Sequence, residues 1–235
     1  PTIFCGVPSM YGAINRFPGL EPEDVNSIRL CVSGGAALPA EVQSRFEALT
    51  GGRLVEGYGL SETSPVAIVN PVFGHRKSGT IGIPISDTLA RVVDHENRSM
   101  LSAGEVGELA IKGPQVMKGY WNMPGETREV LEDGWFYTGD LASQDEEGFI
   151  SIVDRKKDII ISAGMNVYPR EIEEVLLTHP NVVEVAVVGV PSRVREEVVK
   201  AYLVAEQGSA LTKTDIVDFC VGQLSKYKIP KQIEF

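Results

Sequence analysis

The stretch from residue 28 to residue 59 limits the possible folds more than any other part of the chain. It begins with the compact apolar run IRLCVS, which leads directly into the small-residue loop GGAAL. Pro39 then opens a helical segment that Gly51 follows, and a second apolar run, RLVEGYG, occupies 53–59. The residues expected on the inner face of the helix are Val42, Phe46 and Leu49. Strand, glycine loop, helix and strand in this order predict a parallel crossover unit.

The two loops that follow these strands are predicted to share one pocket. If the strands are parallel neighbours, both loops leave the sheet at the same edge, and ligands of open α/β sheets bind in a crevice at that edge. The loop GGAAL at 34–38 and the loop LSETSP at 60–65 would then face one crevice. Since the second loop carries hydroxyl and carboxylate side chains next to Tyr58, the stretch looks like half of a nucleotide site.

The composition excludes several classes of function. The 235 residues are 43% hydrophobic and 23% charged, so the chain can bury a core in one large domain or two ordinary ones. A formal net charge of -10 argues against nucleic acid as a partner, because phosphate binding needs a basic surface. The longest apolar run, VVEVAVVGV, is too short to span a membrane. We therefore expect a cytoplasmic protein with no transmembrane segment, and we leave peripheral attachment to a membrane open.

The cysteines and histidines indicate no metal site. An odd number of widely spaced cysteines favours a reducing compartment over a disulfide framework. These cysteines are Cys5, Cys31 and Cys220. The histidines match no catalytic arrangement and are expected at the surface or at helix ends; they are His75, His95 and His179.

From about residue 72 to residue 153 the pattern changes to short strands separated by Gly, Pro, Asn and Asp turns, which predicts an all-β subdomain. Its strand-like runs are ARVVD, GELAIKG and GFISIVD. QDEEG is expected to be a hairpin turn in which glycine supplies a positive φ angle. The charged segment DRKKD at 154–158 then joins two apolar runs.

The remaining residues predict a small α+β domain in the order β, α, β, β, α. Its first helix is YPREIEEVLLTHP, with Pro169 near the start and an inner face of Ile172, Val175 and Leu176. Its second helix is TKTDIVDFCVGQLSKY, which Thr212 caps. The side chains expected to point inward from it are Ile216, Phe219, Cys220 and Leu224.

Four motifs together resemble the adenylate-forming enzymes, which include acyl-CoA synthetases, carrier-loading adenylation domains and luciferases. The motifs are GYGLSET, GELAIKGPQVMKGYWNMPGET, GWFYTGDL and DRKKDIIISAGMNVYPREIEEVL, and they follow the order and rough spacing of that superfamily. NVYPREIE looks most like the fatty acyl-CoA ligase branch. The resemblance covers the whole chain. It implies activation of a carboxylate with ATP to an acyl-adenylate, followed by transfer to coenzyme A, with Mg²⁺ as the metal.

The resemblance also implies the fold class, α/β and α+β. Residues 1–154 would be the later part of a large AMP-binding domain, divided into an α/β part (1–71) and a β-rich subdomain (72–154). Residues 155–235 would be the small, mobile C-terminal domain.

In the first motif, the resemblance implies that Tyr58 stacks on adenine, with Gly57 and Gly59 allowing close approach of the backbone. Ser61 stands where the superfamily commonly has threonine and would donate its hydroxyl to the α-phosphate. Glu62 would help to hold Mg²⁺, since hard oxygen ligands suit that ion. Taken alone, each of these residues could equally belong to a polar turn.

Further positions follow from the same resemblance. The loop of Gly34, Gly35 and Ala36 would line the adenine and acyl pocket, although turn chemistry alone could also account for it. Asp140 in YTGDL would accept bonds from the two ribose hydroxyls. Arg155 would approach ribose and phosphate.

The last two positions concern movement and the second substrate. Lys157 occupies the hinge position about which the small domain would rotate, whereas Lys156 is interpreted as a solvated residue. Gly164 matches a glycine in the loop that lines the pantetheine channel for coenzyme A.

Two parts of the superfamily pattern are not found between Pro1 and Phe235: a phosphate-binding loop rich in Ser, Thr and Gly, and a late catalytic lysine. We therefore expect about the C-terminal half of a fatty-acid–CoA ligase, inactive by itself, with exposed apolar surface that favours a homodimer or other self-association. The alternatives are an aryl- or other acid–CoA ligase and a non-catalytic adenylate-binding module. The carrier-loading branch fits the hinge segment less well.

Overall fold

The computed structural model describes every residue of the chain except 193 and 195. The chain divides into two compact units, which are described separately. The first unit comprises residues 1–138 and 142–152, and the second comprises residues 139–141 and 153–235. Within the described residues, every helix is too short or too polar to cross a membrane.

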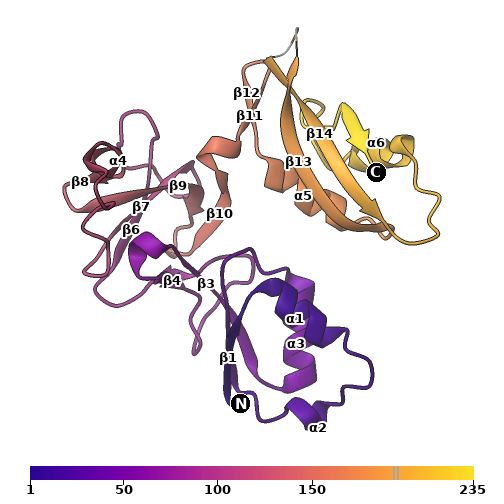
Figure 1. Ribbon diagram of the computed structural model, residues 1–235, viewed down its shortest axis with the longest axis horizontal. Helices are drawn as coiled ribbons and strands as arrows, with labels where there is room; N and C mark the ends of the chain where they lie inside the picture. Colours follow the sequence, from indigo (N-terminus) through magenta and orange to yellow (C-terminus); the bar gives the residue numbers. More distant parts are fainter. Residues whose placement is uncertain (193, 195) are drawn as a thin grey trace. The chain divides into compact units, whose positions relative to one another are not determined.

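The first unit begins with a five-stranded sheet in the order β1-β2-β3-β4-β5 (Figure 1). Strands β1 (Ile3–Gly6), β2 (Leu30–Ser33) and β3 (Arg53–Gly59) run parallel. Strands β4 (Val66–Val69) and β5 (Ile83–Pro84) continue the sheet antiparallel. The parallel pairing of β2 and β3 confirms the predicted crossover unit.

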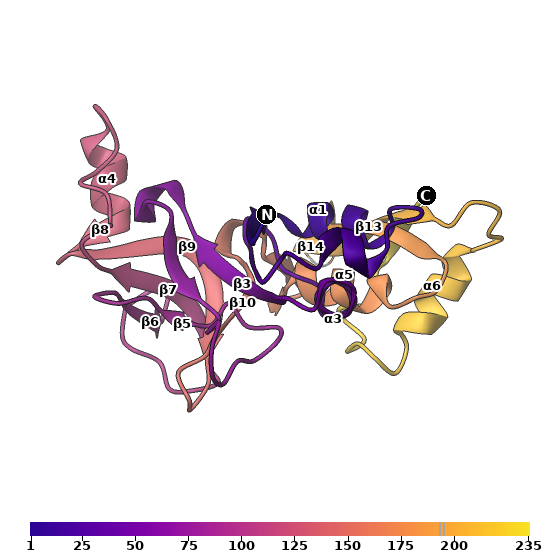
Figure 2. The same ribbon diagram turned by 90° about the horizontal axis from the view of Figure 1, so that it is seen from below.

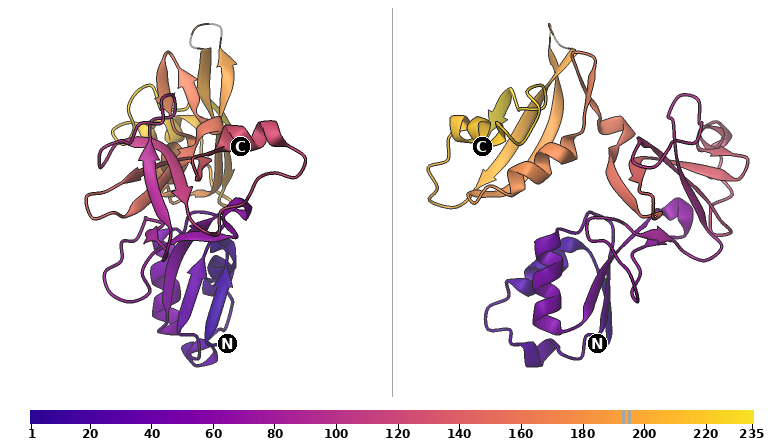
Figure 3. Two further views of the ribbon diagram at one scale, coloured as in Figure 1. Left: turned by 90° about the vertical axis from the view of Figure 1, so that its left-hand side faces the viewer. Right: turned by 180° about the vertical axis from the view of Figure 1, so that it is seen from behind.

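Helices α1 (Pro8–Asn15) and α3 (Ala40–Thr50) lie side by side on one face of the parallel strands, as Figure 3 shows from two sides. The short helix α2 (Pro22–Val25) precedes β2. Gly51 ends α3 in the left-handed conformation, with φ 68°. The buried face of α3 is slightly rotated from the prediction, because its fully buried positions are Gln43, Phe46 and Thr50. The amide of Gln43 can lie there because it donates to the carbonyl oxygen of Leu54 at 2.7 Å and accepts from Ser78 at 2.8 Å.

A second sheet follows in the order β10-β9-β7-β6, and β8 pairs with β9. Its strands are β6 (Leu89–Val93), β7 (Val106–Lys112), β8 (Leu131–Glu132), β9 (Trp135–Gln144) and β10 (Ile150–Arg155). The predicted glycine turn is confirmed, since Gly148 has φ 88°. The subdomain is not all-β, however, because helix α4 (Pro124–Val130) lies between β7 and β8. Pro124 at its first position favours this start.

The C-terminal part of the second unit is an α+β domain, seen from a second side in Figure 2. Its strands are β11 (Ile160–Ser162), β12 (Met165–Val167), β13 (Val182–Ser192), β14 (Glu196–Ala205) and β15 (Gln232–Glu234). Helices α5 (Pro169–Leu177) and α6 (Lys213–Cys220) supply the buried side chains Ile172, Leu176, Ile216 and Cys220 to one core. Thr212 caps α6 as predicted, accepting from the amide of Asp215 at 3.2 Å.

The second helix of this domain is shorter than predicted. It ends at Cys220 because Val221 is extended and Gly222 has φ 90°, so the apolar spacing up to Tyr227 does not continue as a helix. Leu224 is nevertheless buried, whereas Phe219 is only half-buried and packs edge-on against His179 at a ring separation of 4.7 Å.

Candidate functional site

The glycine loop after β2 lies against the end of β3. The register places Ser33 opposite Glu56, so the segments that follow β2 and β3 leave the sheet at the same edge. A Cβ atom on Gly34 would lie 3.3 Å from the carbonyl oxygen of Gly57, which shows how close the two backbones are. Gly35 turns the chain with φ 79°, and Ala36 beyond it is exposed. The glycine loop and the end of β3 therefore meet at one edge of the sheet.

Tyr58 and Gly59 lead into the second loop. Tyr58 is half-buried and packs against the apolar core of the adjoining sheets. Gly59 is required by a close approach: an added Cβ atom would lie 1.7 Å from the carbonyl oxygen of Pro65. A side chain at this position would therefore collide with the returning part of the same loop.

A buried threonine holds this second loop in shape. Ser61, Glu62 and Thr63 form one turn of 3₁₀ helix. Thr63 is fully buried; its hydroxyl lies 2.6 Å from the carbonyl oxygen of Pro65 and accepts from the amide of Leu60 at 2.9 Å. Because Thr63 points inward, Ser61 is left exposed and Glu62 partly exposed at the surface of the loop.

The structure adds one residue to this site that the sequence analysis did not identify. The phenol of Tyr120 donates a hydrogen bond of 2.9 Å to Oε1 of Glu62, and the amide of Met117 donates to the main-chain oxygen of Glu62 at 2.8 Å. Burial, and then the bond to Glu62, raise the pKa of Tyr120, so this phenol keeps its proton at neutral pH. The signal available in the sequence was an aromatic residue after Gly119 in a quoted motif, but nothing in the spacing linked it to residue 62.

Asp140 and Arg155 come together in the second unit. Nε of Arg155 lies 3.5 Å from Oδ1 of Asp140, and the aspartate side chain is 11% exposed against 62% for the arginine. Gly139, with φ 75°, lies immediately before Asp140 within β9. A buried carboxylate beside an exposed guanidinium can accept from hydroxyls while the cation approaches an anion.

The remaining predicted positions lie on turns. Lys157 is exposed in a single 3₁₀ turn, Lys156–Asp158, between β10 and β11. Gly164, with φ 75°, forms the turn between β11 and β12. Shortly before Lys157 in the chain, Asp154 accepts from the amide of Arg170 at 3.0 Å and thereby caps the first turn of α5.

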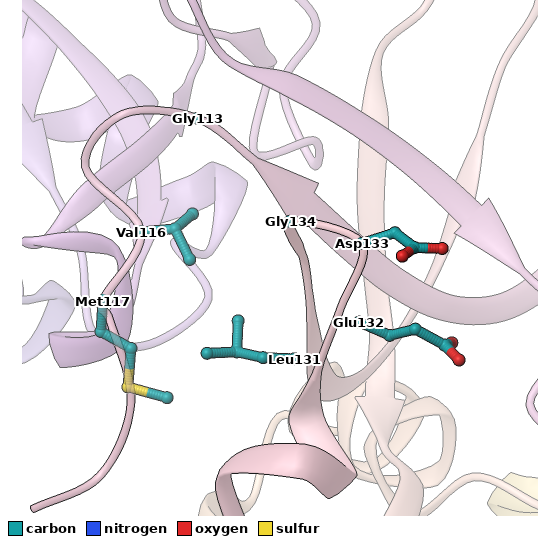
Figure 4. Close-up of a pocket in the computed structure, with 7 residues that line it drawn as sticks. All are labelled: Gly113, Val116, Met117, Leu131, Glu132, Asp133 and Gly134. Carbon is teal, nitrogen blue, oxygen red and sulfur yellow. The ribbon is translucent and has the colours of Figure 1, made fainter.

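The segment that carries Tyr120, here called the strap (residues 113–123), borders a hollow of about 300 Å³. Figure 4 shows Val116 and Leu131 turned toward this space, while the carboxylates of Glu132 and Asp133 extend to the other side. Glu132 is paired with Arg98. On this side, therefore, the strap is bounded by open space.

No group of three or more His, Cys, Asp or Glu side chains in the described residues could hold a metal by itself. Glu62 fits Mg²⁺ in another way, because that ion is commonly held by one or two carboxylates together with the phosphates of a substrate. The bond from Tyr120 engages Oε1 and leaves Oε2 as a hard oxygen ligand.

Comparison with known proteins shows which family the chain resembles. Residues 1–121 match the AMP-binding enzyme family, and residues 171–235 match the AMP-binding enzyme C-terminal domain. A long-chain-fatty-acid–CoA ligase from Bacillus subtilis (strain 168) is 49% identical over 235 residues, which are 100% of this chain and 42% of that protein. A feruloyl-CoA synthase from Amycolatopsis sp. is 40% identical over 100% of this chain and 48% of its own length. Among solved structures, ATP-bound MatB from Rhodopseudomonas palustris superposes with a TM-score of 0.95 at 40% identity, over 100% of this chain and 46% of that chain.

Proposed function

This chain belongs to the AMP-binding enzyme family, and from that premise we propose that it forms part of an AMP-forming ligase that joins a fatty acid to coenzyme A. The chain spans about 42% of the length of the Bacillus subtilis ligase that it resembles. In the reaction, a carboxylate oxygen attacks the α-phosphorus of ATP, and the bond to pyrophosphate breaks. The sulfur of coenzyme A then attacks the acyl carbon, loses its proton to solvent, and displaces AMP.

The observation that carries this proposal is the meeting of Gly34 and Gly57 at one sheet edge, next to the loop of Ser61 and Glu62. Adenine would lie beside the two glycine segments, stacked on the ring of Tyr58. Ser61, exposed at the loop surface, would donate its hydroxyl to the α-phosphate. Gly35 and Ala36 would line the same pocket.

Two polar groups of the second unit are assigned nucleotide contacts in this proposal. Asp140 is buried beside Arg155 and would accept from both ribose hydroxyls. Arg155 is exposed and would approach the ribose and phosphate of the nucleotide. When bound, Mg²⁺ neutralises phosphate charge, and Glu62 is the residue that would hold it.

Lys157 and Gly164 serve the second half of the reaction in this proposal. Lys157 would be the hinge of a mobile domain formed by residues 155–235, and the turn at Gly164 would line the channel for coenzyme A. The enzyme would act in the cytoplasm on lipid metabolism, free or peripherally attached to a membrane.

The test uses the protein that the complete reading frame encodes. AMP release and thioester formation are measured together with ATP, Mg²⁺ and coenzyme A, across acetate, octanoate, palmitate and benzoate. We expect AMP and a CoA thioester in equal amounts with palmitate or octanoate. ATP binding without any AMP release would reject the ligase and favour a non-catalytic adenylate-binding module.

An aryl acid–CoA ligase is the second candidate, because the feruloyl-CoA synthase is 40% identical over the whole chain. Benzoate turnover exceeding palmitate turnover in the same assay would favour it.

Self-association is proposed through the open face of the first sheet. Phe4 contributes to the core beneath α1 and α3, so its neighbours on β1, Ile3 and Cys5, point to the opposite face. Ile3 is 61% exposed and Cys5 is also exposed. For residues 1–235 expressed alone, light scattering should show a mass that increases with concentration; a monomer mass throughout would contradict this.

A further inference from the structure

Glu62 needs an external constraint if its carboxylate is to hold a defined orientation. A glutamate side chain has three rotatable bonds, and ordering it costs conformational entropy. Its own loop orders only the main chain, through the buried hydroxyl of Thr63. The side chain itself accepts a 2.9 Å hydrogen bond from Tyr120 at Oε1.

The strap is attached to this loop at two points. Met117 donates its amide to the main-chain oxygen of Glu62, and three residues later Tyr120 donates its phenol to the side chain of the same residue. The main-chain oxygen and the side-chain carboxylate of Glu62 are thus both hydrogen-bonded to the strap. A shift of the strap would move the carboxylate with it.

Helix α4 in turn holds Tyr120. The hydroxyl of Thr127 accepts from the amide of Tyr120 at 3.0 Å and donates to the main-chain oxygen of Met123 at 2.7 Å. Gly119, at φ 146°, allows this approach, because a Cβ atom there would lie 2.7 Å from the methyl group of Thr127. The strap borders the hollow shown in Figure 4, and these hydrogen bonds fix the position of Tyr120 relative to α4.

We propose that Tyr120 is a positioning residue that sets the orientation of the Glu62 carboxylate, and that Thr127 sets Tyr120. This inference rests on the proposed function, in which Glu62 holds Mg²⁺ beside the phosphates of ATP. Tyr120 touches neither substrate nor metal in this scheme; it acts through Glu62.

The first test replaces Tyr120 by phenylalanine, which removes only the hydroxyl. In the full-length protein, ATP binding is titrated calorimetrically at increasing Mg²⁺, without fatty acid, so the readout is independent of turnover. We expect Tyr120→Phe to raise the Mg²⁺ concentration for half-maximal enhancement of ATP binding about tenfold, and to leave ATP binding in EDTA unchanged. Trp121→Phe is the matched control, because Trp121 lies on the same strap and is 89% exposed. The same Mg²⁺ dependence in Tyr120→Phe and wild type would overturn the proposal.

A double-mutant cycle separates positioning from general loosening of the strap. In a Glu62→Gln background, Tyr120→Phe should produce no further change in Mg²⁺ dependence, because the group that it positions is already lost. A full additional tenfold change in that background would show that Tyr120 acts elsewhere, and would refute the inference.

Thr127 supplies the second pair of variants. Thr127→Val removes both hydrogen bonds at nearly constant volume and should reproduce part of the Tyr120→Phe shift, whereas Thr127→Ser keeps the hydroxyl and should restore the wild-type dependence. The same Mg²⁺ dependence in Thr127→Val and Thr127→Ser would reject the role of Thr127.

The wild-type protein separates the two proposals. If it binds ATP but forms no AMP, the ligase proposal fails. If it turns over and Tyr120→Phe has the same Mg²⁺ dependence, only the positioning inference fails.

Discussion

Single residues at this site are determined by space as much as by chemistry. Gly59 has no positive φ angle, yet a side chain there would collide with the backbone of Pro65. Gly164 is the opposite case, with open space around it but φ 75°. Glycine is thus required at Gly59 and at Gly164 for different physical reasons, and the sequence alone does not distinguish these reasons.

Gly59→Ala is therefore expected to destabilise the first unit by about 3 kcal/mol, since backbone must move to admit a methyl group. Gly125→Ala is the matched control, because Gly125 lies near the start of α4 with no neighbour within 4 Å of an added Cβ atom. Urea unfolding followed by tryptophan fluorescence measures both, since Trp121 and Trp135 belong to the first unit. Equal midpoints for the two variants would contradict the steric argument.

Asp140→Asn should weaken ATP binding by about tenfold to a hundredfold, because the amide offers one acceptor oxygen where two ribose hydroxyls donate. The amide also leaves Arg155 without its carboxylate partner. ATP and 2′-deoxy-ATP are titrated in parallel. If Asp140 binds ribose, the variant loses the discrimination between the two nucleotides, and retained discrimination would place the ribose elsewhere.

At the scale of elements, α5 is joined to β13 through a half-buried carboxylate. Oε1 of Glu173 accepts from the amide of Val187 at 2.8 Å. Burial raises the pKa of Glu173; the bond from Val187 opposes this and nearby Asp154 adds to it. Between the unfolded and the raised folded pKa, the folded chain binds more protons than the unfolded chain, so stability declines as pH rises through that interval.

Glu173→Gln should remove this decline and stabilise the α5–β13 contact at neutral pH by about 0.5 kcal/mol, a small effect because the half-exposed carboxylate is screened by water. The measurement is amide hydrogen exchange at Val187 from pH 4 to pH 8, corrected for intrinsic rates. Glu184→Gln, at an exposed position on β13, serves as control. An identical pH dependence in wild type and Glu173→Gln would disprove this account.

At the scale of the whole chain, the two compact units separate next to the hinge predicted from sequence. The division by contacts falls between residues 152 and 153, and residues 139–141 associate with the second unit. Asp154 caps α5, so this part of the connection is tied to the small domain, and Lys157 follows it in an exposed turn.

Lys157→Pro should leave ATP–pyrophosphate exchange within about threefold of wild type in the full-length protein, and should slow thioester formation by tenfold or more, since proline fixes φ at about -65°. Lys157→Ala removes the charge without fixing the backbone and should resemble wild type in both steps. Equal losses in the two half-reactions of Lys157→Pro would argue against a hinge at this position.

Local sequence patterns predicted the secondary-structure elements whose ends are set by residues close to them in the sequence. Pro39 and Gly51 bound α3, because Pro39 lacks an amide hydrogen and Gly51 adopts a positive φ angle. Thr212 caps α6, because its hydroxyl accepts a hydrogen bond from the amide three residues later. The parallel pairing of β2 and β3 also followed, since a strand, helix and strand of these lengths permit little else. The motifs around Tyr58 and Asp140 placed the candidate site on the chain.

Only the tertiary structure decided the contacts between segments far apart in sequence. Tyr120 reaches Glu62 across 58 positions, and the proximity of Gly59 to Pro65 depends on how the loop returns to the sheet. Helix α4 escaped prediction because its seven residues are too few to establish a hydrophobic period, and α6 ended early because Gly222 adopts a turn conformation that the apolar spacing did not reveal. The sequence by itself determined the family and the elements with local signals; packing determined which side chain orients which, because orientation depends on neighbours that only the fold brings together.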